Sequence, residues 1–245
     1  MKGLMRALGV LLLAVAGWQV LVWLTAVPHF ILPAPERVAR SLWANRALLA
    51  ENAVATYGQI LLGLALGTVL GCGTAVQLAL SPLARVALRP VLVFAQAIPV
   101  FALAPILTLW LGYGPASKVV MVVLVTYFPV ASALHDGLMR MPQGYDDLAR
   151  VMGAGRMRRL WQLQLPLALP ALGSGVRLAA VAAPFGAVIG EWVGSSRGLG
   201  YLMLLANGRA QTDLMFAALV VLAGFTVALH LAVDRLALAL TRRIG

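Results

Sequence analysis

Six long apolar runs divide this chain, and they constrain its fold more than any other feature. Each is close to the roughly 20 residues that an α-helix needs to cross the hydrocarbon core of a bilayer. The hydrophobic fraction of 62% and the mean hydropathy of +0.92 also exceed those of an ordinary soluble domain. The sequence therefore predicts an all-α integral membrane protein with six transmembrane helices, at about residues 8–26, 53–80, 91–111, 116–134, 167–190 and 214–233.

Basic residues are distributed unequally between the two sides of such a bundle. If the N-terminus is cytoplasmic, twelve of the 19 basic residues lie inside, six lie outside, and Arg177 falls within the fifth run, from which it is predicted to reach the cytoplasmic interface. This topology accounts for the net charge of +11 better than nucleic-acid binding does, because no basic face is apparent. The external set is Arg37, Arg40, Arg46, Lys118, Arg197 and Arg209.

The first run follows Lys2 and Arg6, but it is long and lacks a clear cleavage site, so we interpret it as a retained anchor. After it, Pro35 begins a short amphipathic helix that is predicted to lie on the outer membrane surface. Its apolar and basic sides are Val38, Leu42 and Trp43, and Arg37, Arg40 and Arg46. In the second run, the spacing of Gly63, Gly67 and Gly71 indicates close helix packing, with a dimer seam as the alternative.

The longest polar stretch, residues 136–166, lies between the fourth and fifth runs and predicts two short cytoplasmic helices. The first begins after Pro142 and Gly144. It carries a pair of aspartates, ending at Asp147, in its opening turn, where the helix dipole favours anions. It stops at Gly153, a residue type that readily ends helices in the left-handed conformation.

The second helix is predicted from about Arg156 to Leu165, with Pro166 ending it because proline lacks a backbone donor. A Gly-Ala-Gly hinge joins the two helices. At helical spacing each has a small apolar face that needs a covering partner. These faces comprise Leu148, Val151 and Met152 in the first helix and Met157, Leu160 and Trp161 in the second.

The same stretch resembles the cytoplasmic coupling loop of ABC importer permeases. The shared order is an acidic residue, any residue, Ala, three residues, Gly, nine residues, an apolar residue, any residue and Leu-Pro. The departures are Asp147 for Glu, Leu148 for Ala and Leu163 for Ile, which keep charge or apolarity. A solvated loop between two membrane helices is the alternative. The ATPase-coupling residues that the resemblance implies are Asp147, Leu148, Ala149, Met152, Gly153, Ala154, Gly155, Leu163, Leu165 and Pro166.

Two further stretches, 96–114 and 190–202, are similar to the corresponding stretches of the nitrate/sulfonate/taurine-type importers. Their residues are most like those of members assigned to hydroxymethylpyrimidine, the thiamine precursor. The resemblance implies a homodimer in the bacterial inner membrane, two copies of a cytoplasmic ATPase and a periplasmic or lipid-anchored binding protein. It also implies a division into an anchor and amphipathic segment, 1–52, and a five-helix permease core, 53–245.

The sequence shows no motif for catalysis, nucleotide binding or metal binding. The only lysines, Lys2 and Lys118, precede Gly and Val, so no phosphate-binding loop ending in Lys-Ser or Lys-Thr exists. The three histidines lack metal-ligand spacing, and Cys72 stands alone in an apolar run. We therefore expect a transport subunit that is not an enzyme and binds no cofactor, with ATP and Mg²⁺ used by the partner ATPase.

Candidates for the substrate pathway are Gln96, Pro99, Phe101 and Glu191. An acid at membrane depth is a functional candidate, but Glu191 paired with Arg197 or Arg209 at the interface is an equally weighted alternative. For Gln96 the alternative is a hydrogen bond between helices. A secondary transporter or channel competes as a class, yet the spans carry too few charges for a proton relay or an ion filter. A scaffold subunit without a pathway would not need a structured cytoplasmic loop.

Overall fold

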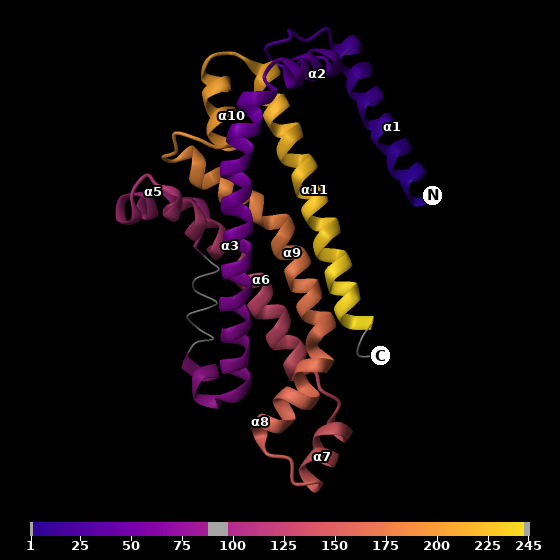
Figure 1. Cartoon of the computed structure of the whole chain (residues 1–245), viewed down its shortest axis with the longest axis vertical. Coiled ribbons are helices and arrows are strands. Elements are labelled where there is room, and N and C mark those ends of the chain that lie inside the picture. The colour runs from indigo at the N-terminus through magenta and orange to yellow at the C-terminus, as the bar shows by residue number, and fades with distance from the viewer. Residues whose placement is uncertain (1, 88–97, 243–245) are drawn as a thin grey trace.

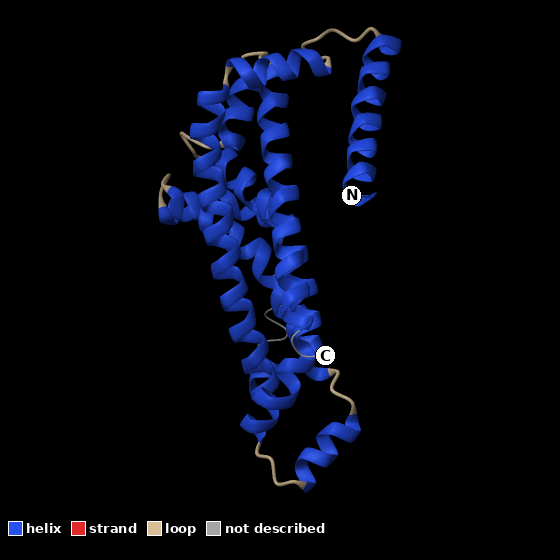
Figure 2. Cartoon of the chain, turned by 45° about the vertical axis from the view of Figure 1, so that its right-hand side comes forward, coloured by secondary structure: helices blue, strands red, loops and turns tan. Residues whose placement is uncertain are grey.

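The computed structural model describes residues 2–87 and 98–242, and every regular element in these ranges is a helix (Figure 2). This confirms the predicted all-α class. The helices are α1 (Lys2–Thr25), α2 (Pro35–Ala44), α3 (Arg46–Leu80), α5 (Val100–Leu111), α6 (Pro115–Met139), α7 (Gln143–Val151), α8 (Arg156–Arg159), the π-helical turn η1 (Leu160–Gln164), α9 (Leu165–Trp192), α10 (Leu199–Gly208) and α11 (Thr212–Arg242).

Four helical segments are long and apolar enough to cross a bilayer: 46–80, 115–139, 156–192 and 212–239. They correspond to the second, fourth, fifth and sixth predicted runs. The first run lies within α1, and the third is described only from residue 98 onward, where it forms α5. The short helix α10 is absent from the sequence-based prediction, because ten residues fall below the length of a span.

The elements are arranged around a bundle of α3, α6, α9 and α11 (Figure 1). At one end lie α2 and α10, and at the opposite end lie α7 and α8, while α1 stands beside the bundle. Trp18 of α1 meets Phe216 of α11 with ring centroids 5.7 Å apart. Arg37 of α2 forms an ion pair with Asp213 of α11 at 3.0 Å. The predicted amphipathic helix is therefore anchored to the bundle, and its Val38 is buried.

Glycines allow α3 to pack directly against α6. A Cβ added at Gly63 would lie 2.4 Å from Cβ of Val122, and one at Gly67 would lie 2.1 Å from Oγ1 of Thr126. Such overlaps show that these positions have no room for a larger residue. The glycine ladder is thus a packing surface within the subunit, and α6 occupies the face that a dimer seam would need.

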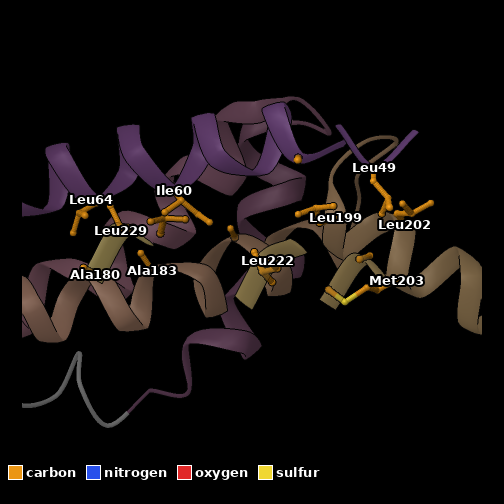
Figure 3. Close-up of a cluster of buried hydrophobic side chains, with 14 of the residues drawn as sticks. Leu49, Ile60, Leu64, Ala180, Ala183, Leu199, Leu202, Met203, Leu222 and Leu229 are labelled. Atoms are coloured by element: carbon orange, nitrogen blue, oxygen red, sulfur yellow. The ribbon is translucent and has the colours of Figure 1, made fainter. Parts of the chain in front are cut away.

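The main apolar core joins α3, α9, α10 and α11. Figure 3 shows Ile60 and Leu64 of α3 pointing toward Ala180 and Ala183 of α9. Ile60, Ala180 and Ala183 are fully buried. The small α9 side chains let the larger α3 side chains fill the space between the helices, which is how close-packed interiors are built.

The predicted end of the second short helix at Pro166 is wrong. The chain stays helical from Arg156 to Trp192, with η1 between α8 and α9. A proline inside a regular α-helix clashes with the carbonyl group four residues earlier. Here the N–H of Leu165 bonds to the carbonyl oxygen of Leu160, five residues back, so a wider turn precedes the proline. Pro166 accordingly sits in the first turn of α9, where its missing N–H is tolerated.

Candidate functional site

The predicted first cytoplasmic helix exists as α7 and ends where expected. Gly153 has a φ of +73°. Its N–H bonds to the carbonyl oxygen of Arg150 at 2.9 Å, and the N–H of Ala154 bonds to that of Ala149 at 2.8 Å. This pair of bonds is a Schellman motif with glycine in the left-handed position, so the sequence-based interpretation of Gly153 is confirmed.

Ion pairs brace α7 against the start of the long helix. Asp146 accepts a hydrogen bond from Arg159 at 2.5 Å and also pairs with Arg150. Arg156 donates to the carbonyl oxygen of Ala79 at the end of α3, at 3.0 Å. Asp147, the residue that the sequence motif singles out, is exposed and forms no ion pair with any described residue. Asp146 therefore holds the loop in place, which leaves Asp147 free at the surface.

An exposed apolar surface covers the outside of this braced loop. Val151 is 87% exposed, Met152 is 75% exposed and Leu148 is 58% exposed, whereas Ala149 faces inward at 5%. Trp161 and Met157 are also more than half exposed. Exposed apolar side chains gathered on one helix face in this way mark an interaction site when they lie on an end of the molecule rich in charged residues.

Five of the predicted coupling residues surround a small cleft between α7 and η1. Its volume is about 220 Å³, and those five are Leu148, Ala149, Met152, Ala154 and Leu163. Leu165 and Pro166 lie beyond it, at the start of α9. At Gly153 and Gly155 an added Cβ would meet nothing within 4 Å, so within the subunit both glycines face open space. The structure thus gathers five of the ten predicted residues around one cleft, and the two glycines face open space.

At the other end of the molecule, Glu191 is 1% exposed and lies beneath the N-terminus of α10. One carboxylate oxygen accepts a hydrogen bond from the Thr56 hydroxyl at 2.7 Å, and the other accepts one from the N–H of Gly200 at 2.7 Å. Its partners are therefore not Arg197 or Arg209, so the interfacial ion pair is wrong. Burial of a carboxylate is tolerated when hydrogen bonds satisfy both oxygens.

The side chains of α3 complete this cap on α10. Asn52 accepts a hydrogen bond from the N–H of Gly198 at 2.8 Å, and Thr56 accepts one from the N–H of Leu199 at 2.7 Å. Three successive N–H groups at a helix start, which otherwise lack partners, are satisfied by three side chains from two other helices. Glu191, Asn52 and Thr56 therefore join α9, α3 and α10. Sequence reasoning missed Asn52 and Thr56, because Thr56 lies within the predicted second run and Asn52 immediately precedes it, and neither position carries a motif.

The remaining pathway candidates lie in other surroundings. Pro99 precedes α5, and Phe101 is 64% exposed on it. Glu191 by contrast is sealed within the α3, α9 and α10 junction. Gln96 lies outside the described residues. The structure therefore does not bring Phe101 and Glu191 into one described site.

Two other charges in the spans also have partners. Arg177 of α9 bonds to Asp234 of α11 at 2.9 Å, so it does not extend freely to the interface as expected. Lys118 is 1% exposed and donates to the carbonyl oxygens of Tyr113 at 2.9 Å and Gly194 at 2.5 Å. Backbone carbonyl groups take the place of water around its ammonium group, so Lys118 is buried, while its predicted place on the external side stays a prediction.

Comparison with known proteins was consistent with this geometry. Residues 63–245 match the family described as "Binding-protein-dependent transport system inner membrane component". A probable ABC transporter permease protein of Haemophilus influenzae is 49% identical over 92% of this chain and 91% of its own length. The riboflavin transport system permease protein RibX of Chloroflexus aurantiacus is 37% identical, over 90% of this chain and 83% of its own.

A second relative at 37% identity is the formylaminopyrimidine transport permease protein ThiX of Halalkalibacterium halodurans, matched over 75% of this chain and 74% of its own. Among solved structures, an inward-facing conformation of the MetNI methionine ABC transporter matches with a TM-score of 0.70 and 22% identity. It covers 80% of this chain and 97% of the matched chain. At this identity the likeness establishes the fold alone.

Proposed function

Because this chain belongs to the family of binding-protein-dependent transport system inner membrane components, we propose that the exposed surface of α7 is where a separate ATPase drives it. The chain is a multi-pass inner-membrane permease subunit of an ABC importer. The observation that carries the proposal is the exposure of Val151, Met152 and Leu148 on a helix that ion pairs connect to the start of the long helical segment. An apolar surface at an end rich in charge needs a protein partner to cover it.

The long helical segment 156–192 is suited to transmit a push from that surface. It begins at the ion pair between Arg159 and Asp146 and ends at Glu191 under α10. Movement of α7 toward a second copy would therefore reach the opposite end of the subunit through one continuous element. ATP and Mg²⁺ belong to the partner in this scheme. This chain contributes the docking surface and the lever.

The assembly we propose is a homodimer with two ATPase subunits and an external binding protein at the α2 and α10 end. Both termini are placed in the cytoplasm on the basic-residue asymmetry. The position of the C-terminal part of α11, toward the α7 end of the bundle, supports this orientation (Figure 1).

For the solute, we favour hydroxymethylpyrimidine or a related thiamine precursor. The support is the equal 37% identity to permeases named for formylaminopyrimidine and riboflavin, both of which contain nitrogen heterocycles. Sulfonates, taurine and nitrate-like solutes rank next. A secondary transporter is disfavoured, because the charged groups of Glu191, Arg177 and Lys118 all hydrogen-bond to other residues in the described part of the chain.

Replacement of Gly153 by Asp tests the coupling surface. The substitution costs roughly 1 kcal/mol of left-handed strain and adds an acid to the proposed docking surface, while leaving the spans untouched. We expect normal membrane insertion, reduced co-purification of the ATPase and loss of substrate-stimulated ATP hydrolysis in reconstituted membranes. Gly144→Asp is the matched control, since Gly144 is helical, has open space around it and lies outside the predicted coupling set. ATPase recovery and stimulated turnover at wild-type levels in Gly153→Asp would contradict the proposal.

A further inference from the structure

The short turn between α5 and α6 brings buried polar groups together at a place that the proposed coupling function does not use. Residues 112–114, which we call the corner, join the two helices. Gly112 has a φ of +78°, and an added Cβ at Gly114 would meet nothing within 4 Å. Glycines on both sides of Tyr113 leave the backbone free to bend there. Contacts from other elements must therefore set the direction of α5 relative to the bundle.

The side chains of α5 are mostly exposed in the described part of the subunit. Two of its twelve residues, Ala104 and Thr108, are buried. Leu109 is 82% exposed and Trp110 is 75% exposed. Figure 1 shows α5 extending to one side of the bundle. Among the described residues, the corner at its C-terminal end is thus the main point at which its direction can be fixed.

The first turn of α6 holds the corner. The Ser117 hydroxyl lies 2.9 Å from the carbonyl oxygen of Gly112 and 3.2 Å from that of Gly114. The Lys118 ammonium group donates to the carbonyl oxygen between them, that of Tyr113, at 2.9 Å. Both α6 side chains are buried. All three carbonyl oxygens of the corner therefore lie within hydrogen-bond distance of two adjacent residues of α6.

Lys118 extends this hold to the segment that follows α9. Its ammonium group also donates to the carbonyl oxygen of Gly194 at 2.5 Å, the only hydrogen bond among the described residues that links α6 or the corner to residues 193–198. An added Cβ at Gly190 would lie 3.2 Å from Cα of Lys118, so α9 packs directly against this lysine. The charge of the neighbouring Glu191 attracts that of Lys118. Lys118 therefore joins the corner to the end of α9.

The same contact is also closely packed. An added Cβ at Gly194 would lie 2.9 Å from Cγ2 of Thr108 and 2.9 Å from a ring carbon of Tyr113. A side chain at this position would push α5 and the corner away from the segment after α9. Gly194 and Lys118 thus act on one contact, because the glycine leaves room for it and the lysine bonds across it.

Stability alone does not account for a lysine in this place. Lys118 is buried within a helix long and apolar enough to cross a bilayer. Burying a charge is costly, and buried charge pairs are often replaceable by apolar residues without loss of stability. A charge inside a span is for that reason a functional candidate. Charge-assisted hydrogen bonds are stronger than neutral ones, which suits a group that fixes one position of α5.

We propose that Lys118 is a positioning residue for transport, which makes α5 move together with α9. The proposal rests on the proposed function, in which the ATPase displaces the long helical segment 156–192. Gly194 follows directly after the end of that segment, so its displacement reaches Lys118 and, through the corner, α5. Phe101, the pathway candidate on α5 that lies apart from Glu191, then responds to the ATPase through this contact.

Spin labels on the two helices test this coupling in the permease–ATPase complex in lipid nanodiscs. After Cys72→Ser, one label replaces Leu109 on α5 and, in a second sample, one replaces Phe185 on α9, since both side chains are more than half exposed. Mg²⁺ and a non-hydrolysable ATP analogue should change the accessibility of both labels to a relaxing agent. Lys118→Met keeps the length of the side chain without its charge. In this variant the change at Leu109 should be lost, and the change at Phe185 should remain.

Gly194→Ala is a second variant, because it disturbs the same contact by overlap and leaves Lys118 in place. It should also abolish the change at Leu109 alone. Its control is Gly114→Ala, which adds a Cβ in open space at the corner. The control for Lys118→Met is Thr126→Val, which removes a buried polar group of α6 that bonds only to carbonyl oxygens of α3 and α6. Both controls should keep the changes at both labels.

The outcomes separate this proposal from the coupling function. A change of wild-type size at Leu109 in Lys118→Met, or in Gly194→Ala if Lys118→Met does not assemble, would show that the lysine does not position α5. Loss of the change at both labels in Lys118→Met would also overturn the proposal, because α9 itself would then depend on Lys118. In either case the proposed function stands, since α9 responds in the wild type. A wild-type complex in which neither label responds would instead contradict the proposed function, and this inference with it.

Discussion

The Glu191 carboxylate accepts a hydrogen bond from the Thr56 hydroxyl, although 135 residues separate them and both side chains are buried. Thr56 in turn accepts one from the N–H of Leu199, so its single oxygen joins the end of α9 to the start of α10. The cost of burying a carboxylate is offset here by capping a helix. The sequence suggests a transport role for Glu191, but its burial is accounted for by its role in capping α10.

Gly198→Ala should destabilise the subunit strongly. The residue has a φ of +119°, and an added Cβ would lie 2.2 Å from Cδ of Glu191. Strain and overlap together should cost at least about 2 kcal/mol, which corresponds to a drop of roughly 4–8 °C in melting temperature. Thermal unfolding in detergent measures this. Gly208→Ala, at the other end of α10 with open space around it, should change little. Equal melting temperatures for the two variants would show that the carboxylate cap contributes no stability.

Asp147→Lys should uncouple the ATPase without disturbing the fold. Asp147 has no ion-pair partner among the described residues, so reversal removes only a helix-dipole interaction of about 0.3–1 kcal/mol. Asp146→Lys should behave differently, since it breaks the pairs with Arg150 and Arg159 and releases α7. Limited proteolysis of the loop distinguishes the two: faster cleavage is expected in Asp146→Lys alone. If Asp147→Lys retains full stimulated ATP hydrolysis, the motif acid takes no part in docking.

The ion pair between Arg177 and Asp234 should behave as a coupled unit. Removing either partner leaves a charge in the span, and we expect Arg177→Leu or Asp234→Leu to cost about 1–3 kcal/mol. The double variant should recover most of the loss, because two apolar groups replace the pair. A double-mutant cycle on thermal stability gives the coupling energy. Additive effects of the two substitutions would mean that the contact contributes nothing.

The orientation of the chain can be read by cysteine labelling. After Cys72→Ser, the only native thiol is gone. A cysteine replacing Arg156 should then react with an impermeant reagent only in inverted vesicles, and one replacing Arg209 only in intact spheroplasts, because these residues lie at opposite ends of the bundle (Figure 1). Labelling of the Arg156→Cys variant from outside would reverse the topology and remove the coupling assignment.

The sequence predicted those features that depend on local patterns. Apolar runs located the long helices, and Gly153 marked the end of α7, because both signals lie within a few consecutive residues. The Glu191 cap was not predictable in this way, since Asn52 and Thr56 approach it only through the packing of α3 on α9. The role of Asp146 was missed for a related reason. Its partner Arg159 lies across a loop, and the spacing of the two residues in the sequence does not predict how that loop folds.

The turn η1 has one more consequence, for how the length of this chain can vary. A π-helical turn accommodates one residue more than an α-helical turn does. Deleting a residue within 160–164 would restore regular winding and swing everything before it by about 100° around the axis of the long helix. The apolar face of α7 would then lie at a different angle to the rest of the bundle. The direction in which the exposed face of α7 meets the proposed ATPase is therefore set by a single inserted residue.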